Sequence, residues 1–384
     1  MLRQKSGTNE LDQALFTATH FGFLPIRAPK ITEVDLELVK HCGSYPHYDA
    51  AEKASLIRHF IEENLSSISY PISVAYKKPA SRKKFGSYSL HVIGSPSGIA
   101  EATLIRAALS ILSEGGYKNL RVDLNCVGDK ESLSAYEREL INFIRKFGTG
   151  LPEEARIILK SDIFNLFRVE TEEFKALREN APQAMSFLST PSRIYFKEVL
   201  EYIDALGINF RLTPELIGEK NHVSHAIFSI RDAGDLNTGT ESVQATPVLA
   251  LGYRYSRLSR ACGLRKDTPL AGVNIFSVTE NVEMVRNIPK PKFCLLQLGK
   301  DAKIKTLNLL EVLRVHRITV HHFLSRDKFG AQLANAEALP VSHLIIIGQK
   351  EALDNTATVR NVITRAQDTI SLLDLPRYLK TIRL

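Results

Sequence analysis

The chain lacks the cysteine patterns of zinc-binding or disulfide-rich proteins. Its four cysteines, Cys42, Cys126, Cys262 and Cys294, stand far apart in a chain of 384 residues, with no CxxC pair and no Cys/His ligand spacing. Widely separated thiols are typical of reduced cytosolic proteins. We therefore predict neither a zinc site nor disulfides.

Long apolar runs are also missing. No stretch approaches the length of a membrane-spanning helix, and the N-terminal sequence MLRQKSGTNE has no apolar signal segment. The hydrophobic content of 44% and the charged content of 24% are those of a soluble globular protein. We expect a cytoplasmic protein with no membrane partner, and the length predicts two or three domains.

The chain has no familiar metal-binding or phosphate-binding motif. His222 and His225 could suggest a metal site, but no HExxH is present, and isolated histidines are the favoured interpretation. His321 and His322 lie on a predicted strand, so their rings face opposite sides and cannot share a metal. The run from Gly94 to Gly98 lacks the lysine of a phosphate-binding loop. We predict no metal.

A basic turn stands out among the features that are present. Residues 72–94 read as two strands, because apolar residues alternate on either side of a polar centre. Five cations without a balancing acid occupy this centre. Either the turn is a solvated surface loop, or it contacts a polyanion such as a nucleic acid. The cations are Lys77, Lys78, Arg82, Lys83 and Lys84.

Positive charge is also concentrated in the last quarter of the chain. The net charge is +8, and residues 292–384 contain seven Lys, seven Arg and eight acids, which gives 14 − 8 = +6. The polar, proline-containing segment 287–292 precedes this region and is the predicted domain boundary. Strands and helices alternate beyond it, which predicts a mixed or parallel sheet covered by helices.

Three colinear segments resemble histidyl-tRNA synthetase, a class II aminoacyl-tRNA synthetase. They are ILSEGGYKNLRVDLNCVGDKESLSAYERELINFI, the helical run from LPEEARIILK to APQAMSFLS, and the tail that begins QLGKDAKIKTLNLLEVLRVHRITV. The resemblance covers nearly the whole chain. It implies an α+β fold: a class II core with an antiparallel sheet, a helical insertion, and an α/β anticodon-binding-type domain. The implied boundaries are 1–148 and 193–286 for the two parts of the core, 149–192 for the insertion, and 292–384 for the last domain.

The same comparison indicates that the catalytic residues of the family are absent. Three family arginines fall at Ala75, Gly218 and Thr279, and neutral side chains cannot replace a guanidinium group beside a phosphate. Arg231 is a nearby cation that could substitute, although a surface role is favoured. The family's motif-2 glutamate, its Glu-Gly-Thr peptide and its two tyrosines fall at Lys77, Ala51, Glu52, Lys53, His222 and Val223. Scaffold positions are kept at Ile227, Phe228, Gly252, Arg254, Tyr255 and Gly272, with Tyr253 in place of a glycine.

These observations favour a non-catalytic histidyl-tRNA synthetase-like protein that binds tRNA or structured RNA as a homodimer. Two alternatives stay open: a regulatory protein-interaction subunit like that of ATP phosphoribosyltransferase, and an active histidine–tRNA ligase with a rearranged site. We expect no cofactor unless the ligase alternative holds, which would require ATP and magnesium. The RNA contacts implied by the resemblance are the five cations of the basic turn and Arg326, Lys328, Gln332 and Arg360 in the last domain, where ordinary surface charge is the competing interpretation.

Overall fold

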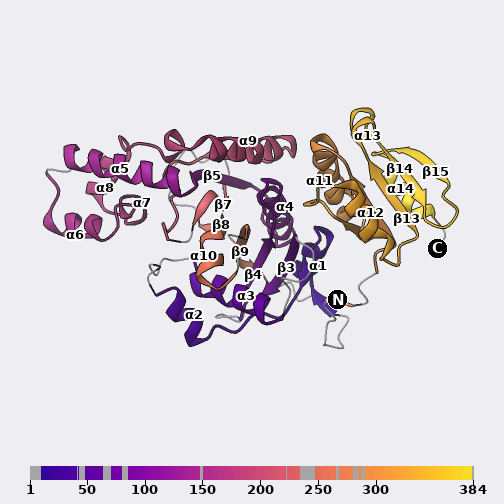
Figure 1. The fold of residues 1–384 in the computed structure, drawn as a ribbon, viewed down its shortest axis with the longest axis horizontal. Coiled ribbons are helices and arrows are strands. Elements are labelled where there is room, and N and C mark those ends of the chain that lie inside the picture. Colours follow the sequence, from indigo (N-terminus) through magenta and orange to yellow (C-terminus); the bar gives the residue numbers. More distant parts are fainter. Residues whose placement is uncertain are drawn as a thin grey trace.

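The protein has three parts, which follow one another along its longest dimension. The computed structural model describes residues 10–40, 42, 48–63, 71–79, 85–147, 150–221, 223–233, 247–264, 268–279, 284–286 and 290–382. A helical insertion lies at one end, a sheet-based core lies in the middle, and an α/β domain lies at the other end (Figure 1). No helix in the described part of the chain is long and apolar enough to cross a membrane.

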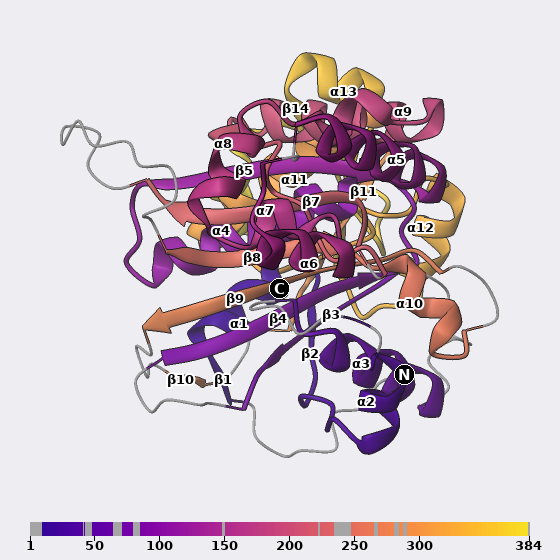
Figure 2. The same cartoon turned by 90° about the vertical axis from the view of Figure 1, so that its left-hand side faces the viewer.

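An eight-stranded sheet forms the core (Figure 2). All pairs of neighbouring strands are antiparallel except β2–β3 and β5–β6. This arrangement confirms the predicted α+β core with an antiparallel-rich sheet. In spatial order the strands are β2 (Leu24–Pro25), β3 (Ile72–Lys77), β4 (Phe85–Ile93), β9 (Leu270–Thr279), β8 (Val248–Arg254), β7 (Ser224–Asp232), β5 (Leu120–Gly128) and β6 (Phe210–Leu212).

The predicted hairpin around the basic turn is present as β3 and β4. The two strands pair antiparallel from Ile72 opposite Ile93 to Lys77 opposite Tyr88. Pro247 lies just before β8 and not within the strand. A proline has no N–H to donate to a neighbouring strand, so the first paired residue follows it.

Each face of the large sheet contributes to a separate hydrophobic core. Because side chains alternate along a strand, Ala75 and Leu90 belong to one core while Val74 and Tyr76 belong to the other. The first face is covered by α1 (Gln13–His20), α4 (Ile99–Glu114) and α9 (Thr190–Ala205), whose buried residues belong to the same core. The second core includes residues of α3 (Ala50–Glu62) and α10 (Ser256–Ala261), and α2 (Glu33–Leu38) packs against α3.

The insertion is a group of helices that extends the second core. Tyr136 and Phe164 stack within it, with ring centroids 5.7 Å apart. Helix α5 lies before the predicted insertion bounds but packs with these helices, and it begins at Lys130 because Asp129 accepts a hydrogen bond from the main chain at Ser132 and so caps the helix. The helices are α5 (Lys130–Phe147), α6 (Glu153–Ser161), α7 (Asn165–Arg168), α8 (Glu172–Arg178) and the 3₁₀ helix η2 (Ala184–Phe187).

The last domain contains a mixed five-stranded sheet with helices, as the strand–helix alternation predicts. Its strand order is β12–β11–β13–β14–β15, in which β12, β11 and β13 are parallel and the last two pairs are antiparallel. The strands are β11 (Phe293–Gln297), β12 (Val320–His322), β13 (His343–Ile347), β14 (Thr356–Asn361) and β15 (Gln367–Ser371). The helices are α11 (Lys300–Val315), α12 (Phe329–Glu337), α13 (Gln349–Asp354) and α14 (Leu375–Thr381).

Helix α11 attaches the last domain to the core. Arg314 forms an ion pair with Glu114 of α4, and Ser110 Oγ donates to Glu311 at 2.9 Å. Buried residues of both domains belong to one continuous hydrophobic cluster. A two-stranded ribbon of β1 (Glu10–Asp12) and β10 (Met284–Arg286) joins the start of the core to the segment that precedes the last domain. The two domains therefore share a packed interface.

Candidate functional site

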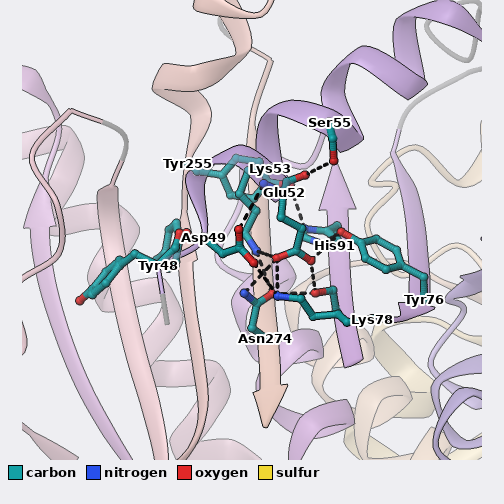
Figure 3. Close-up of polar contacts among 12 residues, drawn as sticks. Tyr48, Asp49, Glu52, Lys53, Ser55, Tyr76, Lys78, His91, Tyr255 and Asn274 are labelled. Atoms are coloured by element: carbon teal, nitrogen blue, oxygen red, sulfur yellow. Dashed lines mark hydrogen bonds and ion pairs between the residues drawn. The ribbon is translucent and has the colours of Figure 1, made fainter. Parts of the chain in front are cut away.

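A group of buried polar side chains lies on the second face of the large sheet, beside the first turn of α3 (Figure 3). Asp49, Glu52 and Lys53 come from the start of this helix, and the remaining members come from strands β3, β4 and β9 or from the residues that directly follow β3 and β8. We call this group the polar cluster. Its members are Asp49, Glu52, Lys53, Tyr76, Lys78, Ser89, His91, Tyr255 and Asn274.

Glu52 is the centre of the polar cluster. Its carboxylate accepts hydrogen bonds from Tyr76 Oη at 2.8 Å and Lys78 Nζ at 2.7 Å, and also from Ser89 Oγ. Asn274 Nδ2 donates to the same carboxylate at 3.2 Å. Burial would raise the pKa of Glu52, but the charges of Lys53 and Lys78 hold it well below the usual range. Glu52 is therefore a buried anion whose oxygens are fully used by the protein.

The two lysines of the polar cluster are paired within the chain. Lys53 is 1% exposed, and its Nζ lies 2.8 Å from Asn274 Oδ1 and 3.4 Å from Glu52. Lys78 Nζ lies 2.8 Å from Asp49 and 2.7 Å from Glu52. Burial lowers the pKa of Lys53, whereas for Lys78 the two carboxylates outweigh burial and raise the pKa. Both positive charges are thus directed at carboxylate or amide oxygens of the protein.

His91 of strand β4 is the imidazole of the polar cluster and lies between two tyrosine hydroxyls. It is fully buried, with Nε2 3.2 Å from Tyr76 Oη and Nδ1 2.9 Å from Tyr255 Oη. Burial and the nearby Lys53 charge hold its pKa well below the usual value, so the ring is neutral at pH 7. Gly272 makes room for this ring, because a Cβ there would lie 2.3 Å from His91 Nδ1.

Tyr253 fills further space beside the polar cluster. This residue stands where the resembled family has a glycine, and its ring centroid lies 5.8 Å from Lys53 Nζ. Its hydroxyl donates to the main-chain carbonyl of Tyr48. A large, fully buried aromatic side chain at a glycine position reduces the room beside α3.

Ala75, the position assigned to the motif-2 arginine, does not face the polar cluster. Ala75 packs in the first core, behind the sheet, whereas its neighbour Tyr76 faces the polar cluster. A shift of one residue reverses the face of every side chain in a strand. The side chains that reach the site are therefore Tyr76 and Lys78, and Lys77 lies on the other face. Neither of the two site-facing residues is an arginine.

The other two arginine positions also carry no guanidinium group. Gly218 is buried, and a Cβ there would lie 2.6 Å from Val223 Cγ1, so the surroundings leave no space for a longer side chain. Thr279 ends β9, where its backbone pairs with Phe85. His222 lies outside the described residues. Arg231 does not replace them, because its Nε lies 3.3 Å from Asp123, which also pairs with Arg121 and Arg211.

The predicted RNA contacts of the basic turn separate into three groups. Lys78 belongs to the polar cluster and is held by its carboxylates. Lys77 is one-third exposed and lies 3.8 Å from Asp12. The remaining cations, Arg82, Lys83 and Lys84, lie outside the described residues.

The predicted contacts of the last domain are also spread over different environments. Gln332 is fully buried, and its side chain binds the main chain of Gln297 in both directions, at 3.0 and 2.8 Å. Lys328 is exposed just before α12, and Arg360 is half-buried on β14. Arg326 is half-buried and contributes to a cavity between the two domains. Gln332 therefore has a structural role and cannot contact a base from this position.

Sequence reasoning missed His91, Ser89 and Asn274 as members of the polar cluster. Each lies on a strand between apolar residues. A polar residue at such a position was the sequence feature that could have indicated a buried polar site. No group of three or more His, Cys, Asp or Glu side chains suited to a metal ion occurs among the residues that the structure describes.

The comparisons with known proteins agree with this architecture. Residues 292–382 match the family model of an anticodon binding domain. The chain is 27% identical over 327 residues to the histidine–tRNA ligase of Thermosynechococcus vestitus, covering 80% of this chain and 73% of that protein. It is 25% identical over 346 residues to the Bacillus licheniformis histidine–tRNA ligase, covering 85% and 80%.

A solved structure has the same fold. The crystal structure of apo S. aureus histidyl-tRNA synthetase superposes with a TM-score of 0.53 at 22% identity, covering 96% of this chain and 94% of that one. This likeness extends through the core, the insertion and the last domain. The chain is therefore similar to histidine–tRNA ligases over most of its length, and it has the fold of a histidyl-tRNA synthetase, with a sheet-based core followed by a domain that matches the anticodon-binding model.

Proposed function

We propose that this protein is a non-catalytic histidyl-tRNA synthetase-like protein that binds tRNA or structured RNA. The observation that carries the proposal is the polar cluster. Its lysines, Lys53 and Lys78, are paired with carboxylate and amide oxygens of the protein itself, and no arginine stands at the three aligned family positions. Amino-acid activation builds negative charge on the phosphates of ATP, which requires unpaired cations fixed in place before the reaction.

The polar cluster does not fit ATP or its magnesium ion. A phosphate beside Glu52 would meet a buried carboxylate, and binding it would break the ion pairs of both lysines. Leaving charges unpaired in a buried site costs about 3–5 kcal/mol. The internally paired state is therefore the more favourable one, and the polar cluster is not suited to hold ATP.

RNA binding is supported by the last domain and by the distribution of charge. The family model matched by residues 292–382 is described as an anticodon binding domain, and residues 292–384 carry +6 of the net charge of +8. Lys328 and Arg360 remain candidates for phosphate or base contacts in this domain. In the core, the remaining candidates for such contacts are Lys77 and the turn residues Arg82, Lys83 and Lys84. Positive surfaces of this kind bind RNA with an affinity that falls steeply with salt.

The proposal can be tested by measuring RNA affinity against salt concentration. Bulk tRNA purified from the native cell should be titrated against the full chain by fluorescence anisotropy. An arbitrary RNA duplex of the same length should be titrated in the same way. Changing Arg82, Lys83 and Lys84 together to Ser should weaken tRNA binding and reduce the salt slope by about two to three units if all three contact phosphates. The double variant Lys328→Ser with Arg360→Ser should weaken binding further.

A charge-matched control separates a specific surface from general electrostatic attraction. Arg145, Lys146 and Lys160 are exposed in the insertion region, and changing them to Ser removes the same charge elsewhere. This control variant should bind tRNA as the unmodified chain does. Equal affinity for tRNA and arbitrary duplex, or equal losses in the turn variant and the control, would refute the RNA-binding proposal and favour a protein partner.

A further inference from the structure

Three arginines surround one buried aspartate on the side of the large sheet that is formed by β5, β6 and β7. Arg121 Nε lies 3.1 Å from Asp123 Oδ1, and Arg211 Nη2 lies 3.0 Å from the same oxygen. Arg231 Nε lies 3.3 Å from Asp123 Oδ2. We call Arg121, Arg211 and Arg231 the arginine cluster. A single carboxylate therefore serves three guanidinium groups.

The strand register brings the arginine cluster to one face of the sheet. Arg121 and Asp123 are two residues apart on β5 and so point to the same face, whereas Val122 between them belongs to the first core. On β7, Arg231 is the direct antiparallel partner of Arg121. On β6, Arg211 is the partner of Asp123. The arginine cluster thus lies on the second face, the face that also carries the polar cluster.

The arginine cluster is separate from the polar cluster. Asp123 pairs with Ser229 on β7, which pairs with Leu251 on β8. Leu251 in turn pairs with Asn274, the member of the polar cluster on β9. Three strand spacings place Asp123 about 14 Å from Asn274. A small ligand at the arginine cluster would therefore leave the ion pairs of the polar cluster intact.

The positive charge of the arginine cluster exceeds what Asp123 can balance. Arg121 and Arg211 alone place two charges against the single charge of Asp123. Arg121 also lies directly opposite Arg231, and like charges in this position destabilise a pair of strands. Burial lowers the pKa of Arg231, and Asp123 raises it. The charges of Arg121 and Arg211 lower this pKa further, so the guanidinium groups repel one another. A bound anion would relieve this repulsion.

Arg121 and Arg211 can both reach a ligand. Their side chains are 22% and 34% exposed. A guanidinium group has five N–H donors, and the closest contact of each arginine with Asp123 uses a single nitrogen. The other nitrogens of the two groups can donate in pairs to the oxygens of one oxyanion, the geometry that arginine forms with phosphate.

We infer that Arg121 and Arg211, assisted by the charge of Arg231, bind the terminal phosphate of a small phosphate monoester. A monoester has three terminal oxygens and close to two negative charges above its second pKa of about 6, so it can accept from both guanidinium groups at once. A phosphate diester, such as a unit of the RNA backbone, has two such oxygens and one charge. The inference goes beyond RNA binding and does not depend on it.

Three matched probes test the inference directly. Methyl phosphate carries a terminal phosphate, dimethyl phosphate is the corresponding diester, and inorganic phosphate lacks the ester. Binding of each to the full chain should be measured by isothermal titration calorimetry at about pH 8 and low salt, without RNA. We expect saturable binding of methyl phosphate. Dimethyl phosphate should bind at least tenfold more weakly, because it has lost a charge and an acceptor oxygen.

Substitutions in the arginine cluster locate the binding. Arg121→Gln and Arg211→Gln should each weaken methyl phosphate binding at least tenfold, since each removes a forked donor. Arg138→Gln, at an exposed arginine of α5, should leave it unchanged. Methyl phosphate should also raise the thermal unfolding temperature of the unmodified chain and of Arg138→Gln, but not of the other two variants. The same unfolding curves show whether each variant is folded.

Four results would overturn the inference. They are the absence of saturable methyl phosphate binding up to millimolar concentration, equal affinity for the diester, binding of inorganic phosphate without binding of methyl phosphate, and unchanged affinity in both Arg121→Gln and Arg211→Gln. Equal affinity for the diester would identify the arginine cluster as a contact for backbone phosphates instead.

Discussion

At the scale of single residues, the polar cluster contains two lysines whose positive charges are neutralised inside the protein. Lys53 and Lys78 share Glu52, and each has a further oxygen partner, Asn274 or Asp49. Glu52 and Lys53 were singled out in the sequence because they align with the family's Glu-Gly-Thr peptide, and Lys78 because it belongs to the basic turn. The hydrogen bonds and ion pairs among these side chains could not be predicted, since Asn274 is more than 200 residues away from Glu52 along the chain. Only the folded sheet brings them together.

A double-mutant cycle tests the pairing of Glu52 and Lys53. Lys53→Met leaves Glu52 with one lysine fewer, and we expect a loss of roughly 2–4 kcal/mol in the free energy of unfolding. The double change with Glu52→Gln should cost less than the sum of the two single changes, because it removes both charges. Urea denaturation at pH 7 measures each value. Lys160→Met, at an exposed lysine, should change stability by less than about 0.5 kcal/mol. Strictly additive losses would contradict the pairing.

At the scale of elements, the sequence predicted most helices and strands because their apolar periods are strong. The β3–β4 hairpin was predicted with nearly correct ends. Strand β9 was not predicted, although it lies between β4 and β8 in the sheet. Its site-facing positions include Gly272 and Asn274, which weaken the apolar pattern of a buried strand. Sequence alone also does not fix which face of a strand is inside, and in the structure Ala75 faces away from the polar cluster.

Asp129 joins two helices and provides a pH-dependent prediction. Its carboxylate accepts from Ser132 at the start of α5 and from Ser189, the N-cap of α9, at 2.6 Å. Burial would raise its pKa, but the hydrogen bonds of these serines outweigh burial and lower it to about 2. The folded state therefore favours the ionised carboxylate. The stabilisation is present above about pH 4, the usual range for an unfolded Asp, and is lost as the pH falls from about 4 to 2.

The loss of stability caused by Asp129→Asn should depend on pH in the same way. We expect it to cost about 1–2 kcal/mol at pH 7, the range for a lost helix cap, and to become nearly neutral relative to the unmodified chain near pH 2. Unfolding by urea at several pH values measures the difference. Asp204→Asn, an exposed residue on α9, should show no such trend. A cost that stays constant from pH 7 to pH 2 would exclude the ionised carboxylate as its source.

At the scale of the whole molecule, the order of core, insertion and last domain was predictable because the resemblance is colinear over nearly the whole chain. The way in which the last domain packs against the core could not be predicted from the sequence. Contacts such as Arg314 with Glu114 and the cavity beside α1 depend on how two folded surfaces meet, and a local sequence pattern contains no information about this.

The proposed homodimer is a further prediction at this scale. Apolar side chains of the N-terminal region are exposed: Leu24 by 47%, Ile31 by 47%, Val34 by 60% and Leu36 by 54%. We expect them to be covered by a second copy related by a two-fold axis. Light scattering at micromolar concentration should then give twice the chain mass of 43.0 kDa.

Charged substitutions locate the interface. The double variant Val34→Glu with Leu36→Glu should shift the protein to monomers, since it buries two carboxylates without partners. Leu353→Glu, at a residue of the last domain that is 72% exposed, should not. A monomeric unmodified chain, or a dimer that tolerates the double variant, would count against this interface.

The central claim, that the class II core no longer activates an amino acid, is tested most directly by histidine-dependent ATP–pyrophosphate exchange. The purified full chain should be compared with the Bacillus licheniformis histidine–tRNA ligase under identical conditions, with and without histidine. Because each missing charge contact typically costs about 10²–10³-fold in rate, we predict exchange indistinguishable from the blank. Saturable exchange that requires histidine would contradict the account and identify the protein as an active ligase.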